Sequence, residues 1–112
     1  MKVLIADDSQ FMRKAISQFV EGDVVEASNE DEAVRLYKEH KPDITFLDVM
    51  MDDTDSGVKA LRRIKEEEPN ARIVLITSLQ KENNLVQEAL ELGVEGYISK
   101  PFEKDQIMKF LN

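Results

Sequence analysis

The sequence predicts a doubly wound α/β fold, in which five parallel strands form a sheet covered by helices on both faces. Short apolar runs alternate along the chain with stretches whose apolar residues recur at helical spacing, and this alternation is typical of α/β proteins. One run, Ile44 to Asp48, has four consecutive apolar or β-branched residues, as expected for a strand buried on both faces. The 112 residues contain no repeat, low-complexity segment or linker, so we expect one domain over residues 1–112.

The first half of the chain supplies three strands and two helices. The predicted strands are Val3 to Ala6, Val24 to Ala27 and Ile44 to Asp48. The first helix is predicted to end at Gly22, and its apolar face consists of Phe11, Met12, Ala15, Ile16, Phe19 and Val20. Asn29, with Glu32 three residues later, is a capping pair that predicts the start of the second helix. Its apolar residues, followed by Pro42 as the stop signal, are Ala33, Val34, Leu36 and Tyr37.

The second half continues the same alternation. An acidic loop over residues 51–57 leads into a third helix, which Pro69 ends and whose inward residues are predicted to be Val58, Leu61 and Ile64. The remaining strands are predicted at Ile73 to Thr77 and Gly96 to Ser99. Between them lies a fourth helix that ends before Gly93 and carries Leu85, Val86, Ala89 and Leu90. A short last helix is predicted over Lys104 to Leu111.

Polar side chains stand at the ends of four predicted strands. Asp7 and Asp8 follow the first strand, Asp48 ends the third, Thr77 ends the fourth and Lys100 follows the fifth. Because the carboxyl ends of parallel strands meet at one edge of the sheet, where ligands bind in such folds, these groups are expected to converge. Each has an ordinary alternative role, such as a helix cap or a solvated loop residue, but four such endings together favour a functional site.

Three clustered carboxylates repel one another and call for a counterion. A set of oxygen ligands suits Mg²⁺, which keeps several waters and often binds phosphate oxygens at the same time. Lys100 adds a positive charge that can pair with a carboxylate or with a phosphoryl oxygen. A carboxylate, a hard metal ion, a hydroxyl group and an ammonium group are the parts needed to transfer a phosphoryl group onto an aspartate.

Composition excludes several classes of protein. The formal net charge of −8 disfavours direct contact with nucleic acid or an anionic membrane, and it suits divalent cations or basic partner surfaces. The chain has no cysteine, which excludes disulfides and zinc–thiolate sites. The first apolar run has only four residues, too few for a signal peptide or a membrane span. We therefore expect a cytoplasmic protein without membrane insertion.

Four motifs together resemble the response-regulator receiver domains. They are Val-Leu-Ile-Ala-Asp-Asp-Ser, Phe-Leu-Asp-Val-Met-Met, Leu-Ile-Thr-Ser and Ile-Ser-Lys-Pro-Phe, in the family's order and near its spacing. The resemblance runs from Val3 to about Phe110, and the stretch Asp-Asp-Ser-Gln-Phe-Met-Arg is similar to the chemotaxis members of the family. It implies a flavodoxin-like sheet with the strand order 2-1-3-4-5.

The resemblance also implies a role for each site residue. Asp48 would be the phosphoacceptor. Asp8 would bind Mg²⁺ directly, Asp7 would help through water, and the carbonyl of Met50 would supply a further ligand.

Other positions would serve the switch and the lifetime of the phosphoryl group. The Thr77 hydroxyl would move to the phosphoryl group, Lys100 would pair with that group, and Tyr97 matches the family's aromatic switch. By the same resemblance, Met50 and Leu79 would occupy the two positions that tune hydrolysis. Both are apolar, which predicts slow loss of phosphate.

The chain departs from the family pattern after the acceptor. The family usually has a proline four residues after this aspartate and a glycine eight residues after it. Here Asp52 stands at the first position and Gly57 is nine residues on, so one residue is inserted. Because proline fixes φ, its absence predicts a less rigid loop. Met12, Met108 and the phenylalanines are expected in the core, and the only histidine, His40, is expected to be structural.

The sequence therefore predicts a phosphoacceptor response regulator that signals by changing its protein-binding surface rather than by enzymatic turnover. Its expected partners are a histidine kinase as phosphodonor and a downstream protein, which for the chemotaxis type is a flagellar motor switch protein; the expected state is a monomer. The alternatives are a stand-alone phosphorelay receiver or a regulator of another protein. A metal-dependent phosphohydrolase is disfavoured because Met50 stands where those enzymes carry a second aspartate. A flavin-binding domain is disfavoured by the acidic crevice.

Overall fold

The computed structural model of the chain describes residues 1–111 and has a five-stranded parallel sheet with the order β2-β1-β3-β4-β5. This confirms the predicted fold and strand order. The elements in chain order are β1 Lys2–Ala6, α1 Gln10–Ser17, β2 Asp23–Ala27, α2 Glu30–His40, β3 Ile44–Leu47, α3 Ser56–Glu67, β4 Ile73–Thr77, α4 Asn84–Leu92, β5 Gly96–Ser99 and α5 Lys104–Leu111.

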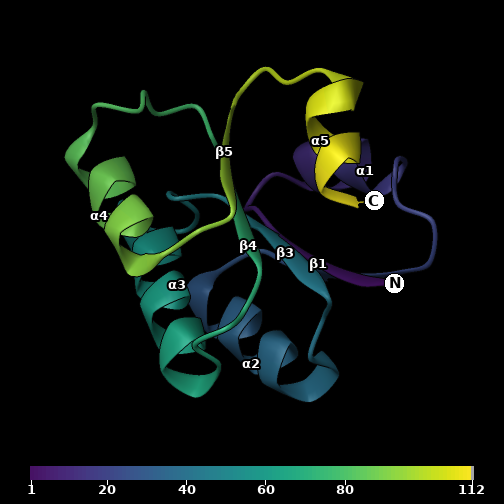
Figure 1. The fold of residues 1–112 in the computed structure, drawn as a ribbon, viewed down its shortest axis with the longest axis horizontal. Coiled ribbons are helices and arrows are strands. Elements are labelled where there is room, and N and C mark those ends of the chain that lie inside the picture. The colour runs from purple at the N-terminus through teal and green to yellow at the C-terminus, as the bar shows by residue number, and fades with distance from the viewer. Residues whose placement is uncertain (112) are drawn as a thin grey trace.

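Helices cover both faces of the sheet (Figure 1). Helices α1 and α5 lie together on one face, where Ile16 and Ile107 pack with Val3, Ile5 and Phe46 of the strands. Helices α2, α3 and α4 lie on the other face over a second buried cluster. Strands β3 and β4 are buried along their whole length, because both of their faces are covered.

Helix α1 is shorter than the sequence predicts. It ends at Ser17 instead of reaching Gly22, and the chain continues in a tighter turn in which the N–H groups of Phe19 and Val20 donate to carbonyls three residues earlier. Phe19 and Val20 still pack against the core cluster, which explains why their spacing resembles that of a helix. Gly22 makes the turn into β2 with a φ of 121°.

The prediction of a core position was wrong for Phe11, which is 79% exposed. The buried residue of α1 is Ile16, five positions later. At about 100° per residue, a five-residue step places Phe11 roughly 140° away around the helix, outside the core stripe. Met12, four positions before Ile16, is half-buried as that geometry requires.

The start of α2 is capped by the residues that the sequence indicates. The Asn29 side chain accepts a hydrogen bond from the Glu32 N–H at 2.9 Å. The Glu32 carboxylate turns back and accepts from the N–H and the hydroxyl of Ser28, at 2.8 and 2.9 Å, and these bonds lower its pKa. Both side chains thus help to satisfy backbone donors where the helix begins.

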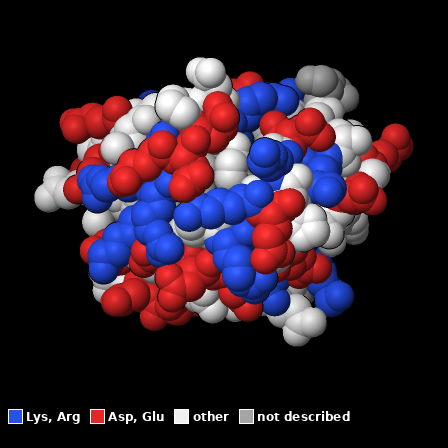
Figure 2. All heavy atoms as spheres, turned by 90° about the horizontal axis from the view of Figure 1, so that it is seen from below, with Lys and Arg blue, Asp and Glu red and all other residues white. Residues whose placement is uncertain are grey.

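Charges of both signs cover the lower side of the molecule in Figure 1. Figure 2 shows this side, with Lys and Arg atoms across its middle and Asp and Glu atoms around them. Ion pairs join α2 to α3, with Lys38 3.3 Å from Glu67 and Arg63 2.8 Å from Glu30.

Within residues 1–111, no helix combines the length and apolar character needed to cross a membrane.

Candidate functional site

The backbone brings the predicted site residues to one edge of the sheet. Strand β3 ends at Leu47, one residue earlier than predicted, so Asp48 is the first residue after the strand. The ladder nevertheless continues, because the Asp48 N–H donates to the Ala6 carbonyl at 3.0 Å and the Lys100 N–H donates to the Thr77 carbonyl at 2.9 Å. These bonds fix where the side chains of residues 48 and 100 leave the sheet.

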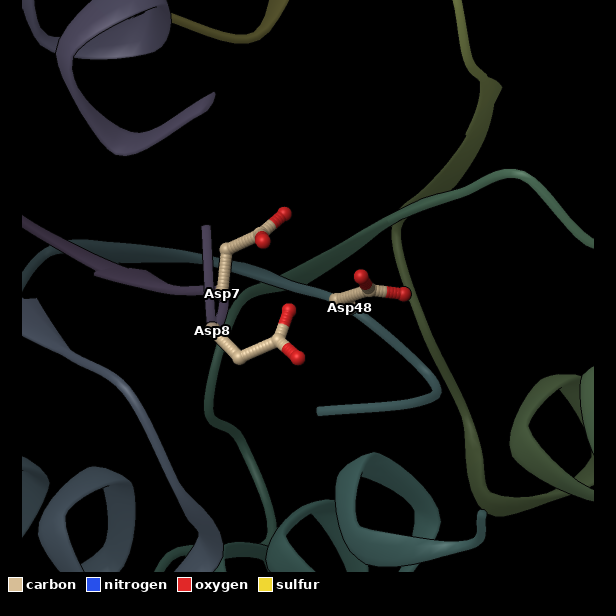
Figure 3. A group of neighbouring side chains, drawn as sticks. All are labelled: Asp7, Asp8 and Asp48. Carbon is tan, nitrogen blue, oxygen red and sulfur yellow. The ribbon is translucent and has the colours of Figure 1, made fainter. Parts of the chain in front are cut away.

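Three carboxylates meet at this edge (Figure 3). Asp7, Asp8 and Asp48 each place a carboxylate oxygen within 4.8 Å of the others. Asp7 and Asp48 are only 2% and 7% exposed, whereas Asp8 lies at the surface. Two carboxylates are therefore removed from water while a third repels them, so the cluster has to be balanced by positive charge.

Lys100, the first residue after β5, supplies part of that charge. Its Nζ atom donates to Asp7 Oδ2 at 2.7 Å and to Asp48 Oδ2 at 2.9 Å. Burial acts to lower the pKa of Lys100, but the bonds and attraction to these two carboxylates outweigh that effect and raise it. The ammonium group is therefore charged across the physiological pH range and holds the two buried acids together.

Burial raises the pKa of Asp48 above its usual value of 3.8. The bond and the positive charge of Lys100 oppose this shift, and the negative charge of Asp7 adds to it. The ionised carboxylate of Asp48 is thus held at a cost in free energy, and a further cation or a bond formed at its oxygen would relieve that cost.

The donor set fits Mg²⁺. With three carboxylates and one ammonium group, the fully ionised cluster has a formal charge of about −2, which a divalent cation balances. All candidate ligands are oxygen atoms. The chain has no cysteine, and His40 lies in the last turn of α2, just before β3 begins. Oxygen-only sites of this kind favour Mg²⁺ over softer metals.

The loop between β1 and α1 fixes Asp7. The Ser9 N–H donates to Asp7 Oδ1 at 2.9 Å, and the Ser9 hydroxyl caps α1 by accepting from Met12 N–H at 3.3 Å. Arg13 donates to the Asp7 carbonyl at 2.6 Å and to Glu26 of β2 at 2.8 Å. No local pattern in the sequence indicates Arg13, because its partner Glu26 is brought near only by the pairing of β1 with β2.

Thr77 and Tyr97 are connected through the backbone of Leu79. The buried Thr77 hydroxyl accepts from the Leu79 N–H at 3.2 Å, and the Tyr97 hydroxyl donates to the Leu79 carbonyl at 2.6 Å. The Leu79 side chain packs against the core cluster. The two predicted switch residues and one of the lifetime positions are therefore parts of one hydrogen-bonded unit.

The loop after Asp48 carries Met50, which is 38% exposed. The Met50 N–H donates to Asp48 Oδ1 at 3.2 Å, and the Gly57 N–H donates to the Val49 carbonyl at 2.8 Å. Residue 57 has to be glycine, because a Cβ atom there would lie 1.8 Å from the Asp48 carbonyl oxygen. The start of α3 thus packs directly against the loop that follows Asp48.

Comparison with known proteins identifies related chains. The family model described as response regulator receiver domain matches residues 3–112. Chemotaxis protein CheY of Halobacterium salinarum is 39% identical over 110 residues, which cover 96% of this chain and 90% of that protein. CheY of Bacillus subtilis is 35% identical over 115 residues, covering 99% and 94% of the two chains.

A solved structure agrees with these sequence matches. A chain in the crystal structure of the CheX-CheY-BeF3-Mg²⁺ complex from Borrelia burgdorferi superposes with a TM-score of 0.87 at 33% identity. The match covers 97% of this chain and 84% of that one.

Proposed function

The chain belongs to the response regulator receiver domain family, and from that premise we propose that residues 1–112 form a single receiver domain that is phosphorylated on Asp48 by a histidine kinase. The observation that carries the proposal is the position of Lys100, which bonds both Asp48 and Asp7 where the carboxylates converge. Asp48 bonds Lys100, and its other carboxylate oxygen accepts from the Met50 N–H in the loop that leads to α3.

The proposed reaction transfers the phosphoryl group from a phosphohistidine of the kinase. An ionised Asp48 oxygen forms a bond to phosphorus as the phosphorus–nitrogen bond breaks, and the histidine leaves with the electron pair of that bond. Lys100 is within reach of the incoming phosphoryl oxygens because it already contacts Asp48 Oδ2. It can exchange a carboxylate contact for a phosphoryl contact without becoming uncharged.

Mg²⁺ would be held by Asp8, Asp7, Asp48 and the Met50 carbonyl. When bound, it supplies positive charge that lets anionic phosphoryl oxygens approach a cluster of carboxylates. The residues of the chain do the remaining work: Asp48 provides the nucleophile, Ser9 orients Asp7 through its N–H group, and Lys100 bridges the acids.

The signal would pass through Thr77. Its hydroxyl oxygen accepts a bond from Leu79, which leaves its own proton free to be donated to a phosphoryl oxygen. A shift of Thr77 toward Asp48 would pull on the Leu79 backbone and so on the hydroxyl of Tyr97. The surface around α4 and β5 would then change, because phosphorylation biases a two-state equilibrium.

The output would be a change in protein binding rather than turnover of a substrate. The similarity to CheY supports a chemotaxis role in the cytoplasm, in which the phosphorylated form binds a flagellar motor switch protein. A phosphorelay receiver, or a regulator of a different protein, uses the same site with another partner. The homologous chain is crystallised with CheX, so a protein of that kind is a second candidate partner.

Incubation with acetyl phosphate and Mg²⁺, followed by intact-mass measurement, tests the proposal. We expect the wild-type chain to gain one phosphoryl group and Asp48→Asn to gain none. Labelling of Asp48→Asn to the same extent as wild type would overturn the assignment, and a wild type that stays unlabelled would count against phosphoacceptor function altogether.

A further inference from the structure

The loop that follows Asp48 is longer than the family pattern and lacks its proline, yet it is tied down at two points. The Gly57 N–H holds the Val49 carbonyl at 2.8 Å. The Ser56 hydroxyl accepts from the Met51 N–H at 2.8 Å and donates to the Asp53 carbonyl, also at 2.8 Å. Ser56 is only 1% exposed and Met51 is 7% exposed, so the bond between them forms away from competing water.

From this arrangement we propose that Ser56 is a positioning residue whose hydroxyl group sets the direction of the Met50 carbonyl. The inference rests on the proposed function, in which that carbonyl helps to hold Mg²⁺. A hydrogen bond thus provides the rigidity that proline provides in the family pattern.

The geometry of the peptide bond carries the inference. The Met50 carbonyl and the Met51 N–H belong to the same peptide unit, which is planar and trans. In such a unit the C=O and N–H groups point in opposite directions, so holding the N–H on Ser56 turns the carbonyl away from Ser56. The preceding peptide is fixed as well, because the Met50 N–H bonds Asp48 Oδ1 at 3.2 Å. Rotation of the Met50 carbonyl would therefore break the bond to Ser56.

Capping of α3 does not explain the contacts of Ser56. Asp55 is the N-cap residue, and its side chain makes no capping bond; instead it lies 3.3 Å from Lys59. The Ser56 side chain contacts the backbone of Met51 and Asp53 in the loop. Its hydroxyl group thus closes the loop that carries the inserted residue.

The inference predicts two effects of Ser56→Ala. The Met51 amide should exchange with solvent faster, because it loses its acceptor. Loss of one ordinary hydrogen bond should lower the fraction of molecules whose loop is in the conformation that binds Mg²⁺. The Kd for Mg²⁺ should therefore rise by roughly three- to tenfold. At saturating Mg²⁺ the rate of labelling by acetyl phosphate should equal that of wild type, because the bound ion selects the same loop conformation.

Ser17→Ala is a matched control. The Ser17 hydroxyl also donates to a backbone carbonyl, that of Lys14 at 3.0 Å, but at the end of α1. This variant removes the same group and should leave both the Mg²⁺ affinity and the Met51 exchange rate at wild-type values. Comparing the two variants at a temperature where both are folded separates loss of positioning from general loss of stability.

The decisive experiment combines a Mg²⁺ titration by calorimetry with amide hydrogen exchange on wild type, Ser56→Ala and Ser17→Ala. An unchanged Kd in Ser56→Ala would overturn the inference, and so would a labelling rate that stays low at saturating Mg²⁺. Rapid exchange of the Met51 amide in wild type would overturn it without any variant. If the wild-type chain binds no Mg²⁺, the proposed function fails and the inference falls with it. If the inference alone fails, wild type still binds Mg²⁺ and is still labelled.

Discussion

Replacing Lys100 with methionine should destabilise the metal-free protein strongly, because it removes the positive charge that two buried carboxylates share. Lys100 Nζ lies 2.7 Å from Asp7 and 2.9 Å from Asp48, and its side chain is 16% exposed. Removing one partner from a buried ion pair costs about 3–5 kcal/mol. Since this site keeps some contact with water, we expect the free energy of unfolding to fall by about 2–4 kcal/mol.

Urea denaturation in the presence of EDTA measures this loss. Mg²⁺ should then restore more stability to Lys100→Met than to wild type, because the variant cluster lacks its internal cation. Lys59→Met is the control: it removes an exposed lysine that pairs with Asp55 on the surface, and little change is expected.

The pH dependence gives a second check on the same variant. The pKa of Lys100 is raised above 10.5 in the folded state, so its stabilising contribution is complete below about pH 10.5 and is lost as the pH rises through the raised value. Wild type should therefore lose stability in that alkaline range by a step that Lys100→Met lacks. Equal unfolding free energies for Lys100→Met and Lys59→Met would refute the idea that Lys100 balances the cluster.

Further expectations concern the acceptor, the switch and the lifetime. Asp48→Asn should be more stable than wild type without Mg²⁺ at neutral pH. The folded pKa of Asp48 is raised above 3.8, so the favourable contribution of this side chain to stability is present below pH 3.8 and is lost as the pH rises through the raised pKa. A lower melting temperature of the variant than of wild type in EDTA would contradict this. Thr77→Ala should still be phosphorylated but should respond weakly around Tyr97, which hydrogen exchange with and without a phosphoryl mimic measures; an equal response in both proteins would count against the switch. A Met50→Asn, Leu79→Glu double variant should lose its phosphoryl group faster than wild type, since polar side chains can hold the attacking water. A time course of phosphate release after removal of the donor measures this. If the double variant loses phosphate no faster than wild type, the loop after Asp48 rather than these two side chains controls the lifetime.

Burial on both faces leaves a clear signal in the sequence of β4. Ile73–Thr77 was predicted with the observed bounds because it is a run of five apolar or β-branched residues, all of them buried. Gly96–Ser99 was also predicted with the observed bounds, although Ile98 is its only buried residue. The convergence of the strand ends followed from parallel topology alone, and the contact of Lys100 with a carboxylate confirms it.

Features that depend on tertiary packing were harder to predict. The sequence pattern could not distinguish a helix continuing to Gly22 from a tighter turn, because Phe19 and Val20 pack on the core either way. It also placed Phe11 in the core, since a run of apolar residues obscures which of them lie on the buried stripe. Only the full geometry of α1 relative to the sheet decides that choice.

Contacts between residues distant in sequence were also beyond sequence reasoning. Nothing local pairs Arg13 with Glu26, or places the Tyr97 hydroxyl on the Leu79 carbonyl. Ser56 is the clearest case. The loss of proline predicted a less rigid loop, and the hydrogen bonds of a buried serine supply a constraint that the spacing alone does not reveal.

The most direct test of the central claim is to locate the phosphoryl group on the chain. Borohydride reduces an aspartyl phosphate to homoserine, so treatment of the acetyl-phosphate-labelled protein followed by peptide mass mapping identifies the modified position. We predict homoserine at residue 48 and unmodified aspartate at Asp7, Asp8 and Asp52. Homoserine at any of those three positions, with aspartate intact at residue 48, would contradict the account.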